Sequence, residues 1–225
     1  MAKNFSKLKT LIITQVTEGE NEGDEENEEN RKAYKSKIWM KSPDLFHFEI
    51  INQPEDKIAT KDHLYRRLLI AGGEGRLNRL LASMGIDLDL VAFTRVDGVV
   101  AYRIGESYAD SPKIIIEKKR FLPLLITYRP PGQDSGQTTT IRFKDYRKVD
   151  KGWYPFEIER FSGGKIDERH MVETIQVNMD IDASVFQSVG ISPPSNNEGE
   201  GGASEGDRLR RIIKTFEEKY RLSTP

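Results

Sequence analysis

The three histidines are the side chains in this sequence best suited to bind a metal or to transfer a proton near neutral pH. His47, His63 and His170 are far apart along the chain, and the chain has no cysteine, so they lack the spacing of a zinc site. We therefore expect each histidine at the surface or at a sheet edge. The absence of cysteine also excludes disulfide and thiolate chemistry.

Two pairs of aspartates could suggest calcium, and one glycine-rich segment could suggest a phosphate loop. The pairs Asp87/Asp89 and Asp180/Asp182 lack the mid-loop glycine and terminal glutamate of a calcium loop. Residues 71–75 (AGGEG) lack the following Lys-Ser/Thr of a phosphate loop, and we expect them to form a turn before a helix. The sequence therefore predicts no metal, no cofactor and no enzymatic activity.

Nucleic-acid binding is an alternative, because basic and aromatic side chains cluster in the second half of the chain. The cluster comprises Lys118–Arg120, Arg142, Lys144, Arg147 and Lys148, with Tyr146 and Trp153. However, the chain has 35 basic and 36 acidic residues and a net charge of -1, so no global basic field attracts a polyanion. The aromatic residues also alternate toward an expected interior. We expect no nucleic-acid partner.

The elements that must position these residues are mainly strands. Residues 37–54 form two amphipathic strand pieces that meet at Ser42-Pro43 and stop at Pro54, because proline removes a ladder donor. Phe46, Phe48 and Ile50 share one face of the second piece. This segment therefore has the pattern of a strand with an aromatic face.

Residues 91–104 show the clearest hairpin pattern. Asp97-Gly98 is favoured in a two-residue type I′ turn, which places Val96 opposite Val99. The face that we expect to point inward carries Val91, Phe93, Val100, Tyr102 and Ile104.

Further strand patterns bring the total to roughly ten or eleven strands, with one or two short helices. Residues 58–70 are ambiguous between strand and helix. Leu77, Leu80, Leu81 and Met84 recur at helical spacing before Gly85, which predicts a short helix lying against the sheet. The remaining strands are expected at residues 5–17, 113–118, 121–129, 138–149, 153–161 and 169–179. The fold class is therefore mainly β.

Three segments fall outside this pattern. Residues 18–30 are rich in acidic residues and predict a disordered, solvated loop within one domain spanning residues 1–190. Residues 191–207 predict a flexible linker. Residues 208–225 predict an amphipathic helix, which could dock on the sheet, pair with a partner or touch an anionic membrane surface. No apolar run reaches the ~18 residues of a membrane span.

A curved sheet closed by a helix has an apolar interior, which either fills with side chains or holds an apolar ligand. The inward faces and the helix stripe then provide the candidate ligand-binding residues. These are Phe46, Phe48, Ile50, Leu77, Leu81, Met84, Phe93, Tyr102 and Ile104.

The order of several motifs resembles the LolA/LolB-like superfamily of bacterial lipoprotein carriers. These motifs are the corner before Pro43 with residues 45–51 (LFHFEII), 141–147 (IRFKDYR), 152–159 (GWYPFEIE), 172–178 (VETIQVN) and 183–186 (ASVF). The resemblance covers roughly residues 5–187. It implies an antiparallel, strongly curved half-barrel of about eleven strands, with short helices covering the concave face. It also implies non-enzymatic binding of acyl chains in a Gram-negative envelope.

Two interpretations of function remain. The first is a periplasmic carrier that binds a lipid or the acyl chain of a lipoprotein for sorting toward the outer membrane, with a signal peptide preceding this sequence; a native start at Met1 would instead imply the cytoplasm. The second is an envelope interaction module with a filled β interior, contacting a protein partner through the C-terminal helix.

Overall fold

The computed structural model describes residues 1–19, 32–51, 64–130 and 138–186. The chain divides into two compact units, Met1–Val189 and Gly190–Pro225, and every described residue lies in the first. The linker at 191–207, the C-terminal helix at 208–225 and residues 20–30 of the acidic loop lie outside the described residues and stay predictions.

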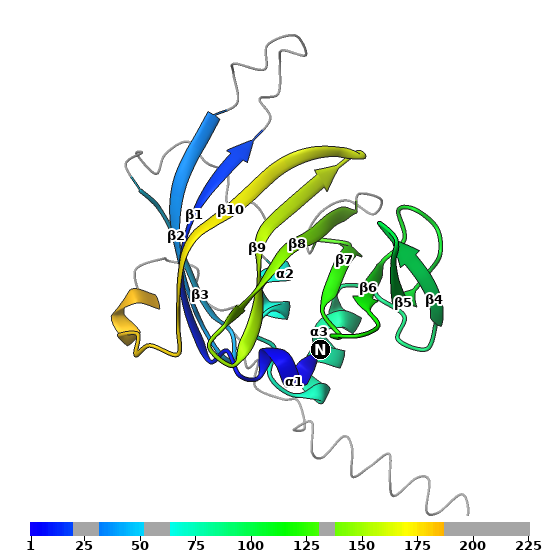
Figure 1. Ribbon diagram of the computed structural model, residues 1–225, viewed down its shortest axis with the longest axis horizontal. Coiled ribbons are helices and arrows are strands. Elements are labelled where there is room, and N and C mark those ends of the chain that lie inside the picture. The colour runs from blue at the N-terminus through cyan, green and yellow to red at the C-terminus, as the bar shows by residue number, and fades with distance from the viewer. Residues whose placement is uncertain (20–31, 52–63, 131–137, 187–225) are drawn as a thin grey trace, which may run out of the picture. The chain divides into compact units, whose positions relative to one another are not determined.

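Ten antiparallel strands form one open, curved sheet in the order β3-β2-β1-β10-β9-β8-β7-β6-β5-β4 (Figure 1). The strands are β1 (Thr10–Gly19), β2 (Lys32–Lys41), β3 (Leu45–Ile51), β4 (Val91–Val96), β5 (Val99–Gly105), β6 (Lys113–Glu117), β7 (Pro123–Tyr128), β8 (Thr139–Val149), β9 (Gly152–Ser162) and β10 (Lys165–Val177). The expected mainly β, half-barrel class is confirmed, with ten strands in the described ranges rather than about eleven.

The described helices are short. They are α1 (Ala2–Phe5), α2 (Leu64–Leu68) and α3 (Glu74–Ser83), followed near the end of the first unit by a 3₁₀ turn, η3 (Ala183–Phe186). The ambiguous segment before the glycine run is thus helical over α2. The glycine run is a turn as expected, since Gly73 has φ 91° immediately before α3. Gly85, with φ 81°, follows the helix at its expected end.

The core lies between one face of the sheet and the helices α2 and α3 (Figure 1). Strand alternation builds this face, since Leu11 and Ile13 of β1 stand opposite Met40 and Ile38 of β2. These four side chains are at most 1% exposed. Burial of such apolar side chains stabilises the fold by about 1.5–3 kcal/mol each.

The register of the β4–β5 hairpin is confirmed. Val96 pairs with Val99, and the turn residues Asp97 and Gly98 have φ 48° and 80°, as a type I′ turn requires.

The strand expected from residue 5 begins only at Thr10. The preceding residues form α1, where Phe5 is buried, and a short connection. Leu8 is nevertheless buried, because its side chain fits over Gly152: a Cβ at residue 152 would lie 2.7 Å from Leu8 Cδ2.

Candidate ligand-binding surface

The candidate residues of β3 lie at one edge of the sheet. Phe46 pairs with Met40 and Phe48 pairs with Ile38, so both phenylalanines are on the core side as expected. Both are half-buried and pack against the core. Ile50, on the same face, is also half-buried.

The candidate residues of α3 belong to the packed core. Leu77, Leu81 and Met84 are 7%, 3% and 0% exposed. Ile104 of β5 stands opposite the fully buried Ile114 and packs against the same cluster. In the described residues, Leu81, Met84 and Ile104 fill the interior under the helices instead of lining an open cavity.

The candidate residues Phe93 and Tyr102 lie at the other edge of the sheet, on β4 and β5 (Figure 1). They pair with each other across the hairpin on the core side, but Phe93 is 67% exposed. The expectation that Phe93 points into an enclosed interior is therefore wrong. The cluster packed on α3 does not extend to this edge of the sheet, so the core-side face of β4 is exposed there. The nine candidates are split between two edges and a filled centre, and they do not form one site.

A row of three aromatic rings lies at the β4–β5 edge. The ring centroids of Phe93 and Tyr102 are 5.1 Å apart, and those of Tyr102 and Phe121 are 6.1 Å apart with an interplanar angle of 11°. Phe121, which follows β6, is 49% exposed. We call Phe93, Tyr102 and Phe121 the aromatic strip. Such a contiguous exposed apolar surface is typical of an interaction site.

Phe121 was not among the predicted residues. It has φ 55°, a left-handed conformation that is unusual for an aromatic residue, and its N–H donates to Glu117 O at 3.0 Å. Such outliers concentrate at functional sites. The sequence places Phe121 at the start of the strand expected at residues 121–129, but β7 begins only at Pro123, so Phe121 lies in the turn before it.

A pocket of about 500 Å³ adjoins the aromatic strip at Phe121. It lies between α1, α3 and the β6–β7 turn, and it shares Leu77 with the core. We call it the rim pocket. Its lining residues are Met1, Ala2, Lys3, Asn4, Lys7, Glu74, Leu77, Arg120 and Phe121. The volume is within the usual range for small-molecule sites, about 300–1,000 Å³.

Cationic side chains flank the aromatic strip. The Lys118 ammonium lies 5.2 Å from the centroid of the Phe93 ring. The Arg120 guanidinium lies 5.4 Å from the Trp153 ring and forms an ion pair with Glu117 at 2.7 Å. The rings provide apolar contact along the strip, and the neighbouring cations repel a ligand that is positively charged.

The interior also contains a buried polar cluster, which sequence reasoning missed. Arg66 of α2 is 0% exposed and donates from Nη2 to Gln15 Oε1 at 3.0 Å. Gln15 Nε2 lies 3.2 Å from both Thr17 Oγ1 and His170 Nδ1. His170 Nε2 in turn lies 3.7 Å from Glu168. The cluster joins α2 to β1 and β10.

The expectation of surface histidines is wrong for His170, which is 1% exposed. Its strand position faces the core side, and the polar cluster satisfies it there. His47 is half-buried, with its ring 5.1 Å from that of Trp39. His63 lies outside the described residues. In the described ranges no group of three or more His, Asp or Glu residues could hold a metal ion.

Tyrosines surround Arg66. Burial raises the pKa of Tyr65 and of Tyr154, so both hydroxyls stay protonated. Burial and, to a smaller extent, the Glu168 carboxylate raise the pKa of Tyr34 to about 12. Burial alone would lower the pKa of Arg66, but Tyr65 and Tyr154 raise it, so the guanidinium keeps its charge.

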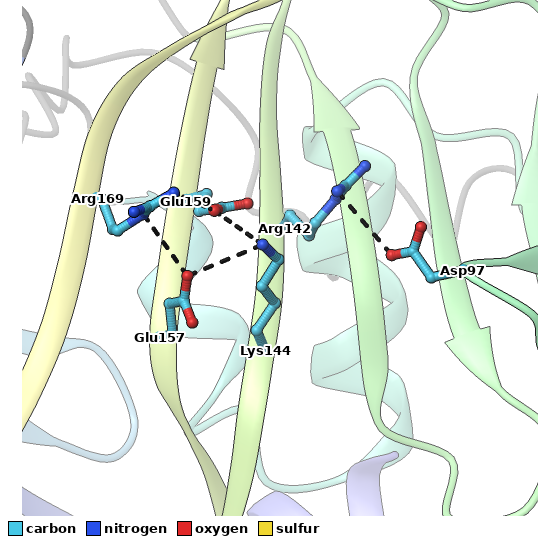
Figure 2. A network of polar contacts seen from close by, with 6 residues as sticks. All are labelled: Asp97, Arg142, Lys144, Glu157, Glu159 and Arg169. Carbon is cyan, nitrogen blue, oxygen red and sulfur yellow. Dashed lines mark hydrogen bonds and ion pairs between the residues drawn. The ribbon is translucent and has the colours of Figure 1, made fainter.

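The carboxylates on the opposite face of the sheet form an ion-pair network, not an acid–base pair (Figure 2). Lys144 Nζ lies 2.8 Å from Glu159 and 3.8 Å from Glu157, and Arg169 lies 3.1 Å and 3.6 Å from the same two carboxylates. Burial would raise the pKa of Glu159, but the hydrogen bonds and charges of Lys144 and Arg169 outweigh it and hold that pKa below its usual range. Glu159 therefore stays ionised, which suits structure and not proton donation.

Comparisons with known proteins agree with this geometry at the level of the fold. No protein-family model and no curated protein sequence matches the chain. A LolA superfamily protein from Nitrosomonas europaea has a similar structure, with a TM-score of 0.52 and 9% identity over 82% of this chain and 94% of that one. An outer membrane lipoprotein-sorting protein domain from Vibrio parahaemolyticus is similar at a TM-score of 0.47 and 11% identity, over 79% and 89% of the two chains.

The chain thus has a LolA-like fold, and the resemblance noted in its sequence is confirmed for the fold. Among the described helices, none is long and apolar enough to cross a membrane.

Proposed function

We propose that this protein is a non-enzymatic carrier that binds the acyl chain of a lipid or lipoprotein on the aromatic strip and in the rim pocket. The observation that carries the proposal is the row of contacting rings Phe93–Tyr102–Phe121, exposed at both ends, which continues into a pocket of about 500 Å³. An acyl chain is long and narrow, so it can follow the row of rings and place one end in the pocket.

The expected affinity is modest. The exposed parts of the three rings amount to about 300 Å² of apolar surface, and their burial contributes about 7 kcal/mol before the costs of association. Burial of the ligand's own surface adds to this term. Weak, reversible binding is what a carrier needs in order to release its cargo.

The LolA-like fold and the motif order support a periplasmic location and transport toward the outer membrane. The same likeness is the basis for a lipoprotein as the cargo.

A second candidate function is an envelope interaction module. Two observations favour it: Leu81 and Met84 belong to a filled interior, and β4 is an edge strand. An edge strand can pair with an extended segment of a partner, and β4 (VAFTRV) has neither the proline nor the lysine that often protects such edges.

Native mass spectrometry of the purified protein, followed by titration with a fluorescent fatty-acyl probe, separates the two functions. Phe121→Asp removes a ring from the strip, and aspartate tolerates the positive φ at this position. The matched control is Tyr108→Asp, since Tyr108 is 72% exposed in the β5–β6 connection and outside the strip.

The carrier function predicts that Phe121→Asp weakens probe binding at least tenfold, while Tyr108→Asp leaves it unchanged. A wild-type protein that carries no lipid and binds no probe would refute the carrier function and favour the interaction module.

A further inference from the structure

Arg66 is buried in a way that its protein contacts do not explain. The residue is 0% exposed, and its contacts in the described structure are to neutral groups: the Gln15 amide, the Tyr154 hydroxyl and the Tyr65 ring, whose centroid lies 5.2 Å from Arg66 Cζ. Its Nε and Nη1 atoms have no hydrogen-bond partner among the described residues. A buried charge normally has counter-charges or a full set of hydrogen bonds, because its desolvation is costly.

Two buried hydroxyl groups on the core-side face of the sheet have a proton that no described residue accepts. They are Ser36 Oγ of β2 and Tyr154 Oη of β9. Ser36 is the cross-strand partner of Gln15, the residue that binds Arg66. The Tyr154 hydroxyl accepts a hydrogen bond from the guanidinium, and this bond contributes to the pKa shifts of both groups. Unused donors of α2 and β9 therefore meet at one charge, and Ser36 of β2 stands next to its partner Gln15.

These unused groups are all able to donate a hydrogen bond. The guanidinium offers N–H donors only, and the serine and tyrosine hydroxyls can each donate one proton. A positive charge with converging donors in a region of low dielectric constant favours an anion with several acceptor oxygens.

We propose that Arg66, Ser36 and Tyr154 bind a small oxyanion, either a carboxylate or a phosphate. The oxyanion is present as a free ion or as the head group of an acyl lipid, since both offer the same oxygens. The proposal does not depend on acyl binding at the aromatic strip, because it rests on residues of α2, β2 and β9 that are not part of the strip or of the rim pocket.

The test uses the full chain and two arginine variants. Arg66→Met removes the charge and keeps a side chain of comparable length. Arg147→Gln is the control for loss of one positive charge, because Arg147 is exposed; it pairs with Asp145, and its guanidinium lies 4.3 Å from the centroid of the Phe156 ring. Thermal unfolding is measured during titration with phosphate and with acetate, at constant ionic strength.

A saturable rise in the unfolding temperature is expected for the wild type and for Arg147→Gln, and it should be absent in Arg66→Met. Oleate and methyl oleate then distinguish the source of the oxyanion. Binding of oleate at least tenfold more tightly than its ester, lost in Arg66→Met, identifies a lipid head group. Saturation by phosphate or acetate without this preference identifies a free ion.

Equal responses of the wild type and Arg66→Met to every oxyanion would overturn the proposal. If Arg66→Met does not fold, Ser36→Ala and Tyr154→Phe replace it, since each removes one hydroxyl and leaves the arginine in place. Each is expected to weaken oxyanion binding about ten- to a hundredfold, in line with the loss of one hydrogen bond to a charged group. Unchanged binding in both would equally refute the site.

Discussion

Truncation of Phe93 should separate ligand binding from stability. The ring is 67% exposed, so about a third of its surface is buried. Full burial of a phenylalanine is worth about 1.5–3 kcal/mol, which gives about 0.5–1 kcal/mol for a third of the ring. The tilted ring contact with Tyr102 adds about 0.5–1.5 kcal/mol. We therefore expect Phe93→Ala to lower the free energy of unfolding by about 1–2.5 kcal/mol.

The matched control is Phe143→Ala. Phe143 is 2% exposed in the core, and truncation of such a phenylalanine costs about 3–5 kcal/mol. Chemical denaturation gives the stability of both variants, and titration with a fatty-acyl probe at a temperature where both are folded gives their affinity. Phe93→Ala should lose most of its affinity and little stability, and Phe143→Ala the reverse. Comparable stability losses, or undiminished probe binding by Phe93→Ala, would refute the placement of the ligand on the strip.

Two further predictions concern the sheet, and a third concerns helix α3. Glu159→Gln should lower the unfolding free energy by about 2–3 kcal/mol at pH 7, since it leaves Lys144 and Arg169 without a buried counter-charge. The pKa of Glu159 in the folded protein lies below its usual value of 4.5, so its contribution to the free energy of unfolding is present above about pH 4.5 and is lost at lower pH. In urea titrations, the difference in unfolding free energy between wild type and variant should therefore be smaller near pH 3 than at pH 7. Gly105→Ala should destabilise the fold by more than about 2 kcal/mol, because φ is 101° and a Cβ would lie 2.5 Å from the Pro112 carbonyl oxygen. Gly75 lies inside α3, and a Cβ at this position would meet nothing within 4 Å, so Gly75→Ala should be neutral or stabilising. Thermal unfolding measures the stability of both glycine variants.

The sheet was predictable because local chemistry determines much of it. Asp97-Gly98 specified the β4–β5 register without any tertiary information, and two-residue alternation placed Phe46 and Phe48 on the core side. The helix stripe of Leu77 and Leu81 was equally readable from its spacing. These patterns depend only on neighbours in the sequence.

The site was less predictable, because exposure depends on where the helices end. Alternation assigns Phe93 and Phe48 to the same face, but it cannot show that the core packed on the helices stops short of Phe93. Phe121 lies in a turn, where periodicity has no meaning. Phe93 and Phe121 each come into contact with Tyr102 only after the strands pair.

The buried polar cluster was missed for a related reason. Gln15 and His170 occupy core-side positions that look like solvent-facing interruptions in a strand pattern. Their burial follows from Arg66, which reaches them from a helix of five residues that was ambiguous in the sequence. Only the tertiary contact makes these polar residues part of the interior.

The central claim is that an acyl ligand lies along the aromatic strip and the rim pocket, and photo-crosslinking tests it most directly. A fatty acid with a photoreactive group on its chain is irradiated with the full-length protein, with excess unlabelled fatty acid as competitor, and adducts are mapped by peptide mass spectrometry. We expect competitor-sensitive adducts in the peptides that contain Phe93, Tyr102 and Phe121. Adducts confined to Phe46 and Phe48 of β3, or adducts that the competitor does not reduce, would contradict it.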